Sequence, residues 1–393
     1  MPSDLTPLLA VDSPLDDARR ALVNDLFARE QRLMDALPTD DPRDAKRRKR
    51  VELTRTEIAG QPQAVRDTLA AGREPSRRAA KELATAGLKR IVMTGCGDSL
   101  AVMIAARQLF EDLIGIPCEP IQALDFAYYA SATLGPDALV ITLSSSGTTT
   151  RTVEAALIAK AQGARTLALS NTPGSALMVE SDHGLPVLAE RKGWPTQAST
   201  AALAMLLQFG LDLAATMGRH PERVERLQAD LDAMPDRMAA LTEACEGTVA
   251  DLARRAASRS IFLFAGGGPS FATALFGAAK VKECSPDHAI AIPLEEFHHY
   301  NSQKSGDPLW LIAPDGPSVA RARDTAFEGT RWGGEVIAVV TEGEVALDAH
   351  AGTVLRLPAV PEPLSVLLTS VPVQLFAYHL AMAKFAAADA AEA

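Results

Sequence analysis

The densest group of chemically capable side chains lies in residues 144–150, where six of seven residues carry a hydroxyl group. These residues read SSSGTTT; they follow the apolar run Leu139–Leu143, which is typical of a buried strand, and precede a helical pattern. A strand, a short Ser/Gly loop and a helix N-terminus offer backbone N–H groups, hydroxyl donors and the positive end of a helix dipole to one small volume. Such an arrangement suits a bound dianion.

A simpler interpretation of these hydroxyl groups is a turn with an N-cap, since Ser and Thr are the usual capping residues. One hydroxyl group is enough for a cap, so the large number present favours an anion site. Residues 144–149 are called the hydroxyl loop below.

The chain contains a second copy of the segment around the hydroxyl loop. The run IVMTGCGDSLAVMIAA from Ile91 resembles IFLFAGGGPSFATALF from Ile261, and the offset near 170 residues persists through later strand-like segments. At the place of the hydroxyl loop the second copy reads IAPDGPSV, where Pro314 and Pro317 remove N–H donors and Asp315 adds negative charge. We therefore expect one anion site per chain, in the first copy.

Strand-like runs alternate with helical patterns in each copy, as is typical of a parallel sheet with helices on both faces. The predicted fold class is α/β, with a doubly wound parallel sheet in each copy. Ligands of such sheets bind beyond the carboxyl ends of the strands. The glycine turn 95–99 and the hydroxyl loop both follow strand-like runs, so we expect both at that edge.

The repeat divides the chain into four predicted parts. They are a polar helical leader, an N-terminal domain, a helical connector and a C-terminal domain, over residues 1–50, 51–218, 219–258 and 259–393. Apolar residues at helical spacing predict one helix in the leader, over 16–37, and a second helix over 51–71 that opens the N-terminal domain.

The composition excludes several classes of protein. A chain of 393 residues with 47% hydrophobic and 22% charged residues is ordinary for a globular protein of two or three domains. The net charge of -10 argues against a nucleic-acid partner, and the basic run Lys46–Arg50 is interpreted as a solvated helix face or linker. We expect no membrane partner and a cytoplasmic location, because no signal segment, no apolar run of about 18 residues and no disulfide framework is visible.

Other ligand-binding motifs are weak or missing. Gly95-x-Gly97 resembles the start of a dinucleotide fingerprint, but Leu100 stands at the third glycine position. Walker A, His-Glu-x-x-His and Gly-x-Ser-x-Gly motifs do not occur. Glu295 and His298, one helical turn apart, are a conceivable metal pair, but no further ligands stand nearby. We expect neither a cofactor nor a metal.

The doubled unit, the SSSGTT loop and the GCGDS turn resemble SIS (sugar isomerase) domains, which bind phosphosugars. The sequence is most similar to the isomerase half of glucosamine-6-phosphate synthase, from ELTRTEIAGQP at Glu52 to QLFAYHLAMAK ending at Lys384. The resemblance implies two tandem SIS domains and an enzyme that interconverts aldose and ketose forms of a sugar phosphate, expected to be a hexose 6-phosphate. It further implies a homodimer with its active site at the subunit interface.

The resemblance implies that seven residues bind the substrate, namely Gly97, Asp98, Ser99, Ser144, Ser145, Ser146 and Thr149. The loop hydroxyl groups and Ser99 would hold the phosphate, and Gly97 would let the backbone approach the sugar.

Two further motifs of the family carry its catalytic residues. The K-x-K-E run is found as KVKE, Lys280–Glu283, and the E-x-x-H run as Glu295–His298. By resemblance, Glu283 moves a proton between C1 and C2, beside Lys280, and His298 opens the sugar ring from across a dimer interface. A partly desolvated carboxylate and a histidine suit these two tasks.

The plain alternative is that Glu283 is a solvated helix residue paired with a neighbouring lysine. His299, the neighbour of His298, would point elsewhere on a helix.

The sequence departs from the synthases at several positions. Ser145 stands where they carry glutamine, and Asp98 where they carry threonine. Asp98 is expected to face sugar hydroxyls, which suggests a substrate other than fructose 6-phosphate. The family's glutaminase half and C-terminal loop lysine are not visible, and residue 2 is Pro2 where the glutaminase has a nucleophilic cysteine. We therefore expect no transfer of ammonia from an amide.

Three functions remain open at this point. The first is aldose–ketose isomerisation of a sugar phosphate, including an amino-sugar variant in which ammonia leaves. The second is a non-catalytic sensor of sugar phosphates. The third is isomerisation of a sugar with another anion, such as a sulfonate, because hydroxyl and N–H donors do not distinguish one oxyanion from another.

Overall fold

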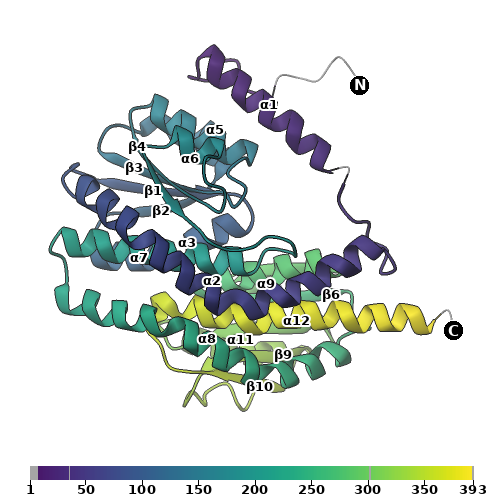
Figure 1. The fold of residues 1–393 in the computed structure, drawn as a ribbon. Coiled ribbons are helices and arrows are strands. Elements are labelled where there is room, and N and C mark those ends of the chain that lie inside the picture. Colours follow the sequence, from purple (N-terminus) through teal and green to yellow (C-terminus); the bar gives the residue numbers. More distant parts are fainter. Residues whose placement is uncertain (1–7, 35, 301, 392–393) are drawn as a thin grey trace.

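The structure is a computed structural model that describes residues 8–34, 36–300 and 302–391. Its described residues form two parallel five-stranded sheets, one in each half of the chain (Figure 1). The first has the order β2-β1-β3-β4-β5, formed by Cys118–Gln122, Arg90–Gly95, Ala138–Leu143, Arg165–Ser170 and His183–Pro186. The second has the order β7-β6-β8-β9-β10, formed by His288–Pro293, Ile261–Gly266, Pro308–Ala313, Glu335–Thr341 and Thr353–Leu357. The two orders correspond strand for strand, so the predicted repeat and fold class are confirmed.

The order of strands in the first sheet fixes where a ligand can bind. Strand β1 pairs with both β2 and β3, so the direction of winding reverses between β1 and β3. Parallel sheets of this kind bind ligands at that reversal, beyond the carboxyl ends of the strands. Gly95 pairs with Leu143, so the glycine turn and the hydroxyl loop leave the sheet side by side.

Helices cover both sheets. Those of the first half are α3, α5, α6 and α7, over Asp98–Ile114, Thr150–Ala161, Ala176–Glu180 and Gln197–Thr216, and the short turns α4, η1 and η2 cover Ala123–Asp125, Phe126–Ala130 and Ser131–Thr133. Those of the second half are α9, α10, α11 and α12, over Ser270–Cys284, Phe297–Tyr300, Val319–Arg331 and Glu362–Ala390. Helix α8, Pro221–Arg255, lies between the halves in sequence and packs on α12. One apolar core runs through both halves, from Ile91 in β1 to Phe262 in β6.

The two helices expected before the first sheet are both present. The first is α1, Asp17–Met34, which lies against α5 (Figure 1). The second, α2, is longer than expected and runs from Ala45 to Leu83. It begins early because Asp44 caps it, accepting hydrogen bonds from the N–H groups of Lys46 and Arg47.

The early start of α2 corrects the interpretation of the basic run Lys46–Arg50. The run is the first turn of a packed helix, and the side chain of Arg47 is only 4% exposed. The Arg47 guanidinium donates to the carbonyl oxygen of Thr39, pairs with Asp40 at 2.8 Å and donates to the carbonyl oxygen of Glu283 at 3.0 Å. The run therefore helps to fix the end of α9, and is not merely a solvated face or linker.

Helices α7 and α12 are long and apolar enough to cross a membrane by length and composition alone. In the folded chain 89% of the most apolar window of α7 and 78% of that of α12 are buried against other parts of the protein. Such burial is typical of core helices in a globular protein.

Candidate functional site

The hydroxyl loop forms an ordered turn between β3 and α5. The Ser144 hydroxyl lies 2.8 Å from that of Thr149 and 3.3 Å from that of Ser146, and it accepts a hydrogen bond from the Gly147 N–H at 3.0 Å. The Ser146 hydroxyl accepts from the Thr148 N–H at 3.2 Å. Thr149 is the N-cap of α5, yet its side chain makes no capping bond. The hydroxyl groups therefore do more than cap a helix, as an anion site requires.

Gly147 makes this turn possible. Its φ of +64° lies in the left-handed region, and a Cβ atom at this position would collide with the Ser175 hydroxyl. The carbonyl oxygen of Ser145 is fixed on the other side by the Asn171 N–H at 3.2 Å and the Thr172 hydroxyl at 3.3 Å. The loop is held from both sides before any ligand arrives.

The glycine turn places Asp98 and Ser99 in the first turn of α3, beside the hydroxyl loop. Gly97 has a φ of +57° and is exposed, so a ligand can approach its backbone. Asp98 does not simply face solvent. Its carboxylate lies 2.8 Å from the Lys280 ammonium and accepts a hydrogen bond from the Ser199 hydroxyl at 3.2 Å.

Lys280 joins the two halves of the chain at this site. Its side chain is only 1% exposed, and besides Asp98 it pairs with Glu283, one helical turn along α9. Asp98, Lys280 and Glu283 are called the lysine cluster below. The plain alternative to a catalytic Glu283 was a solvated pair with a neighbouring lysine, but Lys280 is buried and bridges two carboxylates from different domains.

The environment of the lysine cluster shifts the pKa of two of its members. Burial raises the pKa of Glu283; the Lys280 charge opposes this shift and the Asp98 charge adds to it, leaving the pKa above its ordinary value. For Lys280, burial alone would lower the pKa, but the charges of Asp98 and Glu283 outweigh it and the net pKa is raised. Lys280 therefore stays an ammonium at neutral pH, next to a carboxyl that takes up a proton more readily than usual.

The structure also shows residues near Glu283 that the sequence interpretation missed. The Arg50 guanidinium stacks on Trp194, 3.6 Å from the ring centroid, and its charge lowers the pKa of Glu283. The segment that carries Trp194 is tied to α2, since its N–H donates to the Thr54 hydroxyl at 2.8 Å. Helical spacing of Arg47, Arg50 and Thr54 was the available signal, but it does not tell a buried face from an exposed one.

His298 lies in α10, at the second sheet. Its Nε2 atom is 2.9 Å from the Thr325 hydroxyl and its Nδ1 atom 2.9 Å from the Glu328 carboxylate, and its side chain is 6% exposed. Among the described residues it makes no hydrogen bond or ion pair with the lysine cluster. Within one chain, the structure thus brings together Asp98, Lys280 and Glu283 but leaves His298 on its own.

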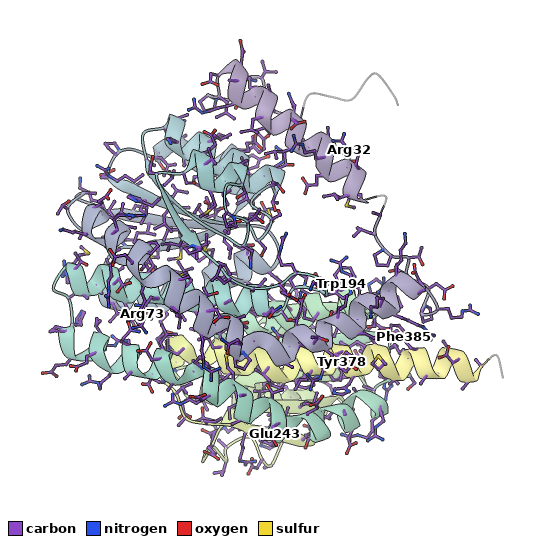
Figure 2. All side chains as sticks on the ribbon, in the orientation of Figure 1. Arg32, Arg73, Trp194, Glu243, Tyr378 and Phe385 are labelled. Carbon is purple, nitrogen blue, oxygen red and sulfur yellow. The ribbon has the colours of Figure 1, made fainter. Side chains whose placement is uncertain are left out.

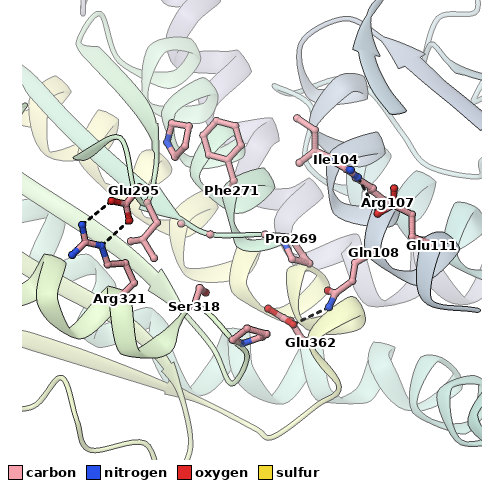
Figure 3. A pocket seen from close by; sticks show the side chains of 16 residues that line it. Ile104, Arg107, Gln108, Glu111, Pro269, Phe271, Glu295, Ser318, Arg321 and Glu362 are labelled. Carbon is pink, nitrogen blue, oxygen red and sulfur yellow. Dashed lines mark hydrogen bonds and ion pairs between the residues drawn. The ribbon is translucent and has the colours of Figure 1, made fainter. Parts of the chain in front are cut away.

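A cavity of about 700 Å³ lies at the corresponding edge of the second sheet (Figure 3). It is lined by the second glycine turn, Gly266–Pro269, and by Glu362 at the start of α12, whose carboxylate accepts from Gln108 Nε2 at 3.0 Å. A Cβ atom on Gly316 would collide with this carboxylate, and one on Gly268 would lie 3.9 Å from it. A fixed carboxylate against both loops opposes anion binding in the second copy.

No cluster of His, Cys, Asp and Glu side chains able to hold a metal ion is found among the residues that the structure describes.

Comparison with known proteins defines the family to which this chain belongs. Residues 85–211 and 256–384 match the SIS domain, and the chain belongs to the SIS domain family. It is homologous to the isomerase domain of glutamine–fructose-6-phosphate aminotransferase over about 84% of its length.

Individual relatives support this assignment. The chain is 31% identical over 350 residues to glutamine–fructose-6-phosphate aminotransferase (isomerizing) of Corynebacterium diphtheriae, covering 84% of this chain and 55% of the relative. It is 33% identical over 306 residues to the Pseudomonas aeruginosa protein of the same name, and the match covers 76% of this chain and 50% of that relative. The chain therefore spans about half the length of these curated relatives.

Solved structures share the fold. The C-terminal domain of glucosamine-fructose-6-phosphate aminotransferase from Francisella tularensis superposes with a TM-score of 0.76 at 24% identity, covering 84% of this chain and 96% of that one. Tagatose-6-phosphate ketose/aldose isomerase from Escherichia coli superposes with a TM-score of 0.68 at 20% identity, and the match covers 84% of this chain and 92% of that one.

Proposed function

We propose that this protein is a cytoplasmic aldose–ketose isomerase of a phosphosugar, with Glu283 as the proton-transferring base. The observation that carries the proposal is the lysine cluster, in which a carboxyl of raised pKa is held by a buried ammonium at the edge of the sheet where parallel α/β sheets bind ligands. The family and its phosphosugar-acting relatives support the substrate class.

Substrate binding is proposed to start at the hydroxyl loop. Ser144, Ser146 and Thr149, with Ser99 of the glycine turn, hold the phosphate through hydroxyl and N–H donors at the start of α5. Ser145 lies in the same loop and shapes it through its carbonyl oxygen. The sugar then extends from the phosphate along Gly97 and Asp98 towards Glu283.

The chemical step moves one proton and needs no external oxidant. Glu283 takes the proton from C2 of the open-chain aldose while the carbonyl oxygen on C1 gains a proton, giving an enediol. Glu283 then returns the proton to C1 as the hydroxyl on C2 loses its proton and becomes the carbonyl of the ketose. Lys280 stabilises negative charge that develops on these oxygens, because its ammonium is fixed and water is excluded around it.

Ring opening is assigned to His298 in a homodimer whose active site lies at the subunit interface. The Glu328 carboxylate lies 2.9 Å from Nδ1 of His298 and helps to fix the orientation of the ring. To reach a partner's sugar, the ring must exchange its contacts with Thr325 and Glu328 for the sugar oxygen.

The experiment that tests the function is incubation of the pure protein with a panel of hexose 6-phosphates and glucosamine 6-phosphate, followed by product analysis and an assay for ammonia. Conversion of one sugar phosphate into its ketose or aldose partner supports the isomerase, and ammonia release specifies the amino-sugar variant. Binding without conversion across the panel supports the non-catalytic sensor instead. Sulfonate analogues of the same sugars are assayed beside this panel, and conversion of the sulfonates alone would show that the anion assigned to the hydroxyl loop is wrong.

A further inference from the structure

Helix α1 lies next to the hydroxyl loop although it is distant in sequence and precedes the SIS domains. Its buried residues Val23 and Leu26 pack in one apolar cluster with Val153 and Leu157 of α5. Figure 1 shows α1 lying beside α5 and α6, on the outside of the first domain. The apolar contact fixes α1 to the helix whose N-terminus the hydroxyl loop forms.

The last turns of α1 enclose a cavity together with the hydroxyl loop. Its volume is about 410 Å³, and its polar lining comes from Arg29, Glu30, Arg32, Ser146, Thr148 and Thr149. Two of the three loop residues, Ser146 and Thr149, are those assigned above to the phosphate. The loop offers only neutral donors to this space, and the two cations in its lining both come from α1.

The three charged residues of α1 have different partners. Arg29 pairs with Asp25 at 2.7 Å on its own helix, and Glu30 accepts a hydrogen bond from the Thr150 hydroxyl at 2.5 Å. Arg32, labelled in Figure 2, makes no hydrogen bond or ion pair with any other described residue. Glu30 thus anchors α1 to the start of α5, while Arg32 keeps its full donor capacity next to the loop hydroxyls.

We propose that α1 completes the anion site, with the Arg32 guanidinium binding the phosphate group of the ligand that the hydroxyl loop holds. This inference rests on the proposed function, because it takes a phosphate monoester as the ligand. The hydroxyl loop supplies no positive side-chain charge to this cavity, and a guanidinium matches phosphate oxygens with two parallel hydrogen bonds. The Glu30 carboxylate, which anchors α1 to Thr150, opposes an anion in this cavity, but the cations Arg29 and Arg32 outnumber it. Because Arg29 is paired with Asp25, Arg32 is the charge that recognises the anion.

The test compares Arg32→Ala with a matched variant, Arg19→Ala, by calorimetric titration with inorganic phosphate, fructose 6-phosphate and fructose. Arg19 lies on the same helix but pairs with Asp16 and does not line the cavity. Arg32→Ala is expected to weaken binding of both phosphate-bearing ligands by about tenfold or more, since a charge-assisted hydrogen bond is lost. Fructose binding and the melting temperature should stay unchanged, as should all three titrations of Arg19→Ala.

Arg32→Lys adds a second, independent measurement. It keeps the charge but loses the planar fork, so its affinity for phosphate should fall between those of the unmodified protein and Arg32→Ala. Two results would show that the inference is wrong while the proposed function stands. In the first, Arg32→Ala binds the phosphate ligands as tightly as the unmodified protein does. In the second, Arg19→Ala lowers the affinity for these ligands as much as Arg32→Ala does. If the unmodified protein binds neither inorganic phosphate nor fructose 6-phosphate, the phosphate assignment of the hydroxyl loop is wrong, and the inference fails with that part of the proposed function.

Discussion

At the scale of single residues, the proposed role of Glu283 as a base depends on how Asp98 and Lys280 shift its pKa. A proton-transferring base must be ionised, so activity is present above the pKa of Glu283 and lost as the pH falls through it. Because burial and Asp98 raise this pKa, the acid limb of the pH profile should lie above that of an ordinary glutamate. The two neighbours act in opposite directions, which makes them separately testable.

Asp98→Asn is predicted to move the acid limb of kcat/KM to lower pH. The substitution removes a negative charge that raises the pKa of Glu283, and leaves Lys280 to act on Glu283 alone. The measurement is kcat/KM across the pH range for the variant and the unmodified protein. A limb that stays in place or moves to higher pH would show that Glu283 is not the titrating base.

Lys280→Met is predicted to lower the free energy of unfolding by about 3–5 kcal/mol, the usual cost of leaving a buried charge without its partner. Exposed Lys282, two positions along α9, supplies the control, and Lys282→Met should stay within about 0.5 kcal/mol of the unmodified protein. Denaturant titration measures both.

The pH dependence of this loss has a definite sign. The raised pKa of Lys280 means that its contribution is complete at neutral pH and is lost only as the pH rises through that raised pKa. Without the ammonium, which lowers the pKa of Glu283, this carboxyl takes up a proton more easily, so the deficit of Lys280→Met should shrink as the pH is lowered. A deficit that grows on acidification would contradict this electrostatic explanation.

At the scale of elements, the turn between β3 and α5 is sensitive to one added methyl group, because Gly147 leaves no room for a Cβ atom. Gly147→Ala must strain a left-handed φ and collide with the Ser175 hydroxyl, whereas Gly163→Ala, with a φ of +83° and open space around it, must only strain φ. We predict a loss of about 1–2 kcal/mol for Gly163→Ala and a larger one for Gly147→Ala. Gly147→Ala should also abolish phosphate binding.

Thermal unfolding and phosphate titration of the two glycine variants check this prediction. Equal losses of stability, or intact phosphate binding in Gly147→Ala, would mean that the shape of the loop does not create the anion site.

Elements of the fold were predictable where the signal is local. Strand-like runs, helical periods and the doubled glycine turn lie within short windows, so the two parallel sheets and the SIS domains follow from the sequence. Only part of the lysine cluster could be predicted from the sequence. Lys280 and Glu283 are close in sequence, but no local pattern indicates that Asp98 of the other domain pairs with Lys280.

Two other features of the site could not be predicted for the same reason. The basic run before Val51 has the composition of a solvated surface, yet Arg47 is buried and donates to the carbonyl oxygen of Glu283 in α9, 236 residues further along the chain. The apolar stripe of α1 predicts a packed helix but not its partner, so its position against the hydroxyl loop is visible only in three dimensions.

At the scale of the whole molecule, the repeat has diverged into one proposed anion site and one acidic counterpart. The second copy keeps the sheet and the glycine turn, but the Glu362 carboxylate lies against its two loops, at Gly268 and Gly316. The proposed homodimer gives the second copy another task, since it carries His298 in α10.

Mixed dimers of Glu283→Gln and His298→Ala chains are predicted to regain turnover that neither variant shows alone. One of the two sites in such a dimer combines an intact Glu283 from one chain with an intact His298 from the other. Co-expression with two different tags and purification on both gives the mixed species for assay. No recovery, with the mixed dimer intact, would place His298 outside the partner's site.

The central claim, that Glu283 moves the proton between C1 and C2, is tested most directly by proton NMR in D2O with the sugar phosphate that the protein binds. The unmodified protein should replace the C2 proton of the aldose with deuterium as the enediol forms and collapses. Glu283→Gln should bind the sugar with similar affinity but exchange the proton more slowly by about a hundredfold or more. Undiminished exchange in Glu283→Gln would contradict the account, whatever the affinity.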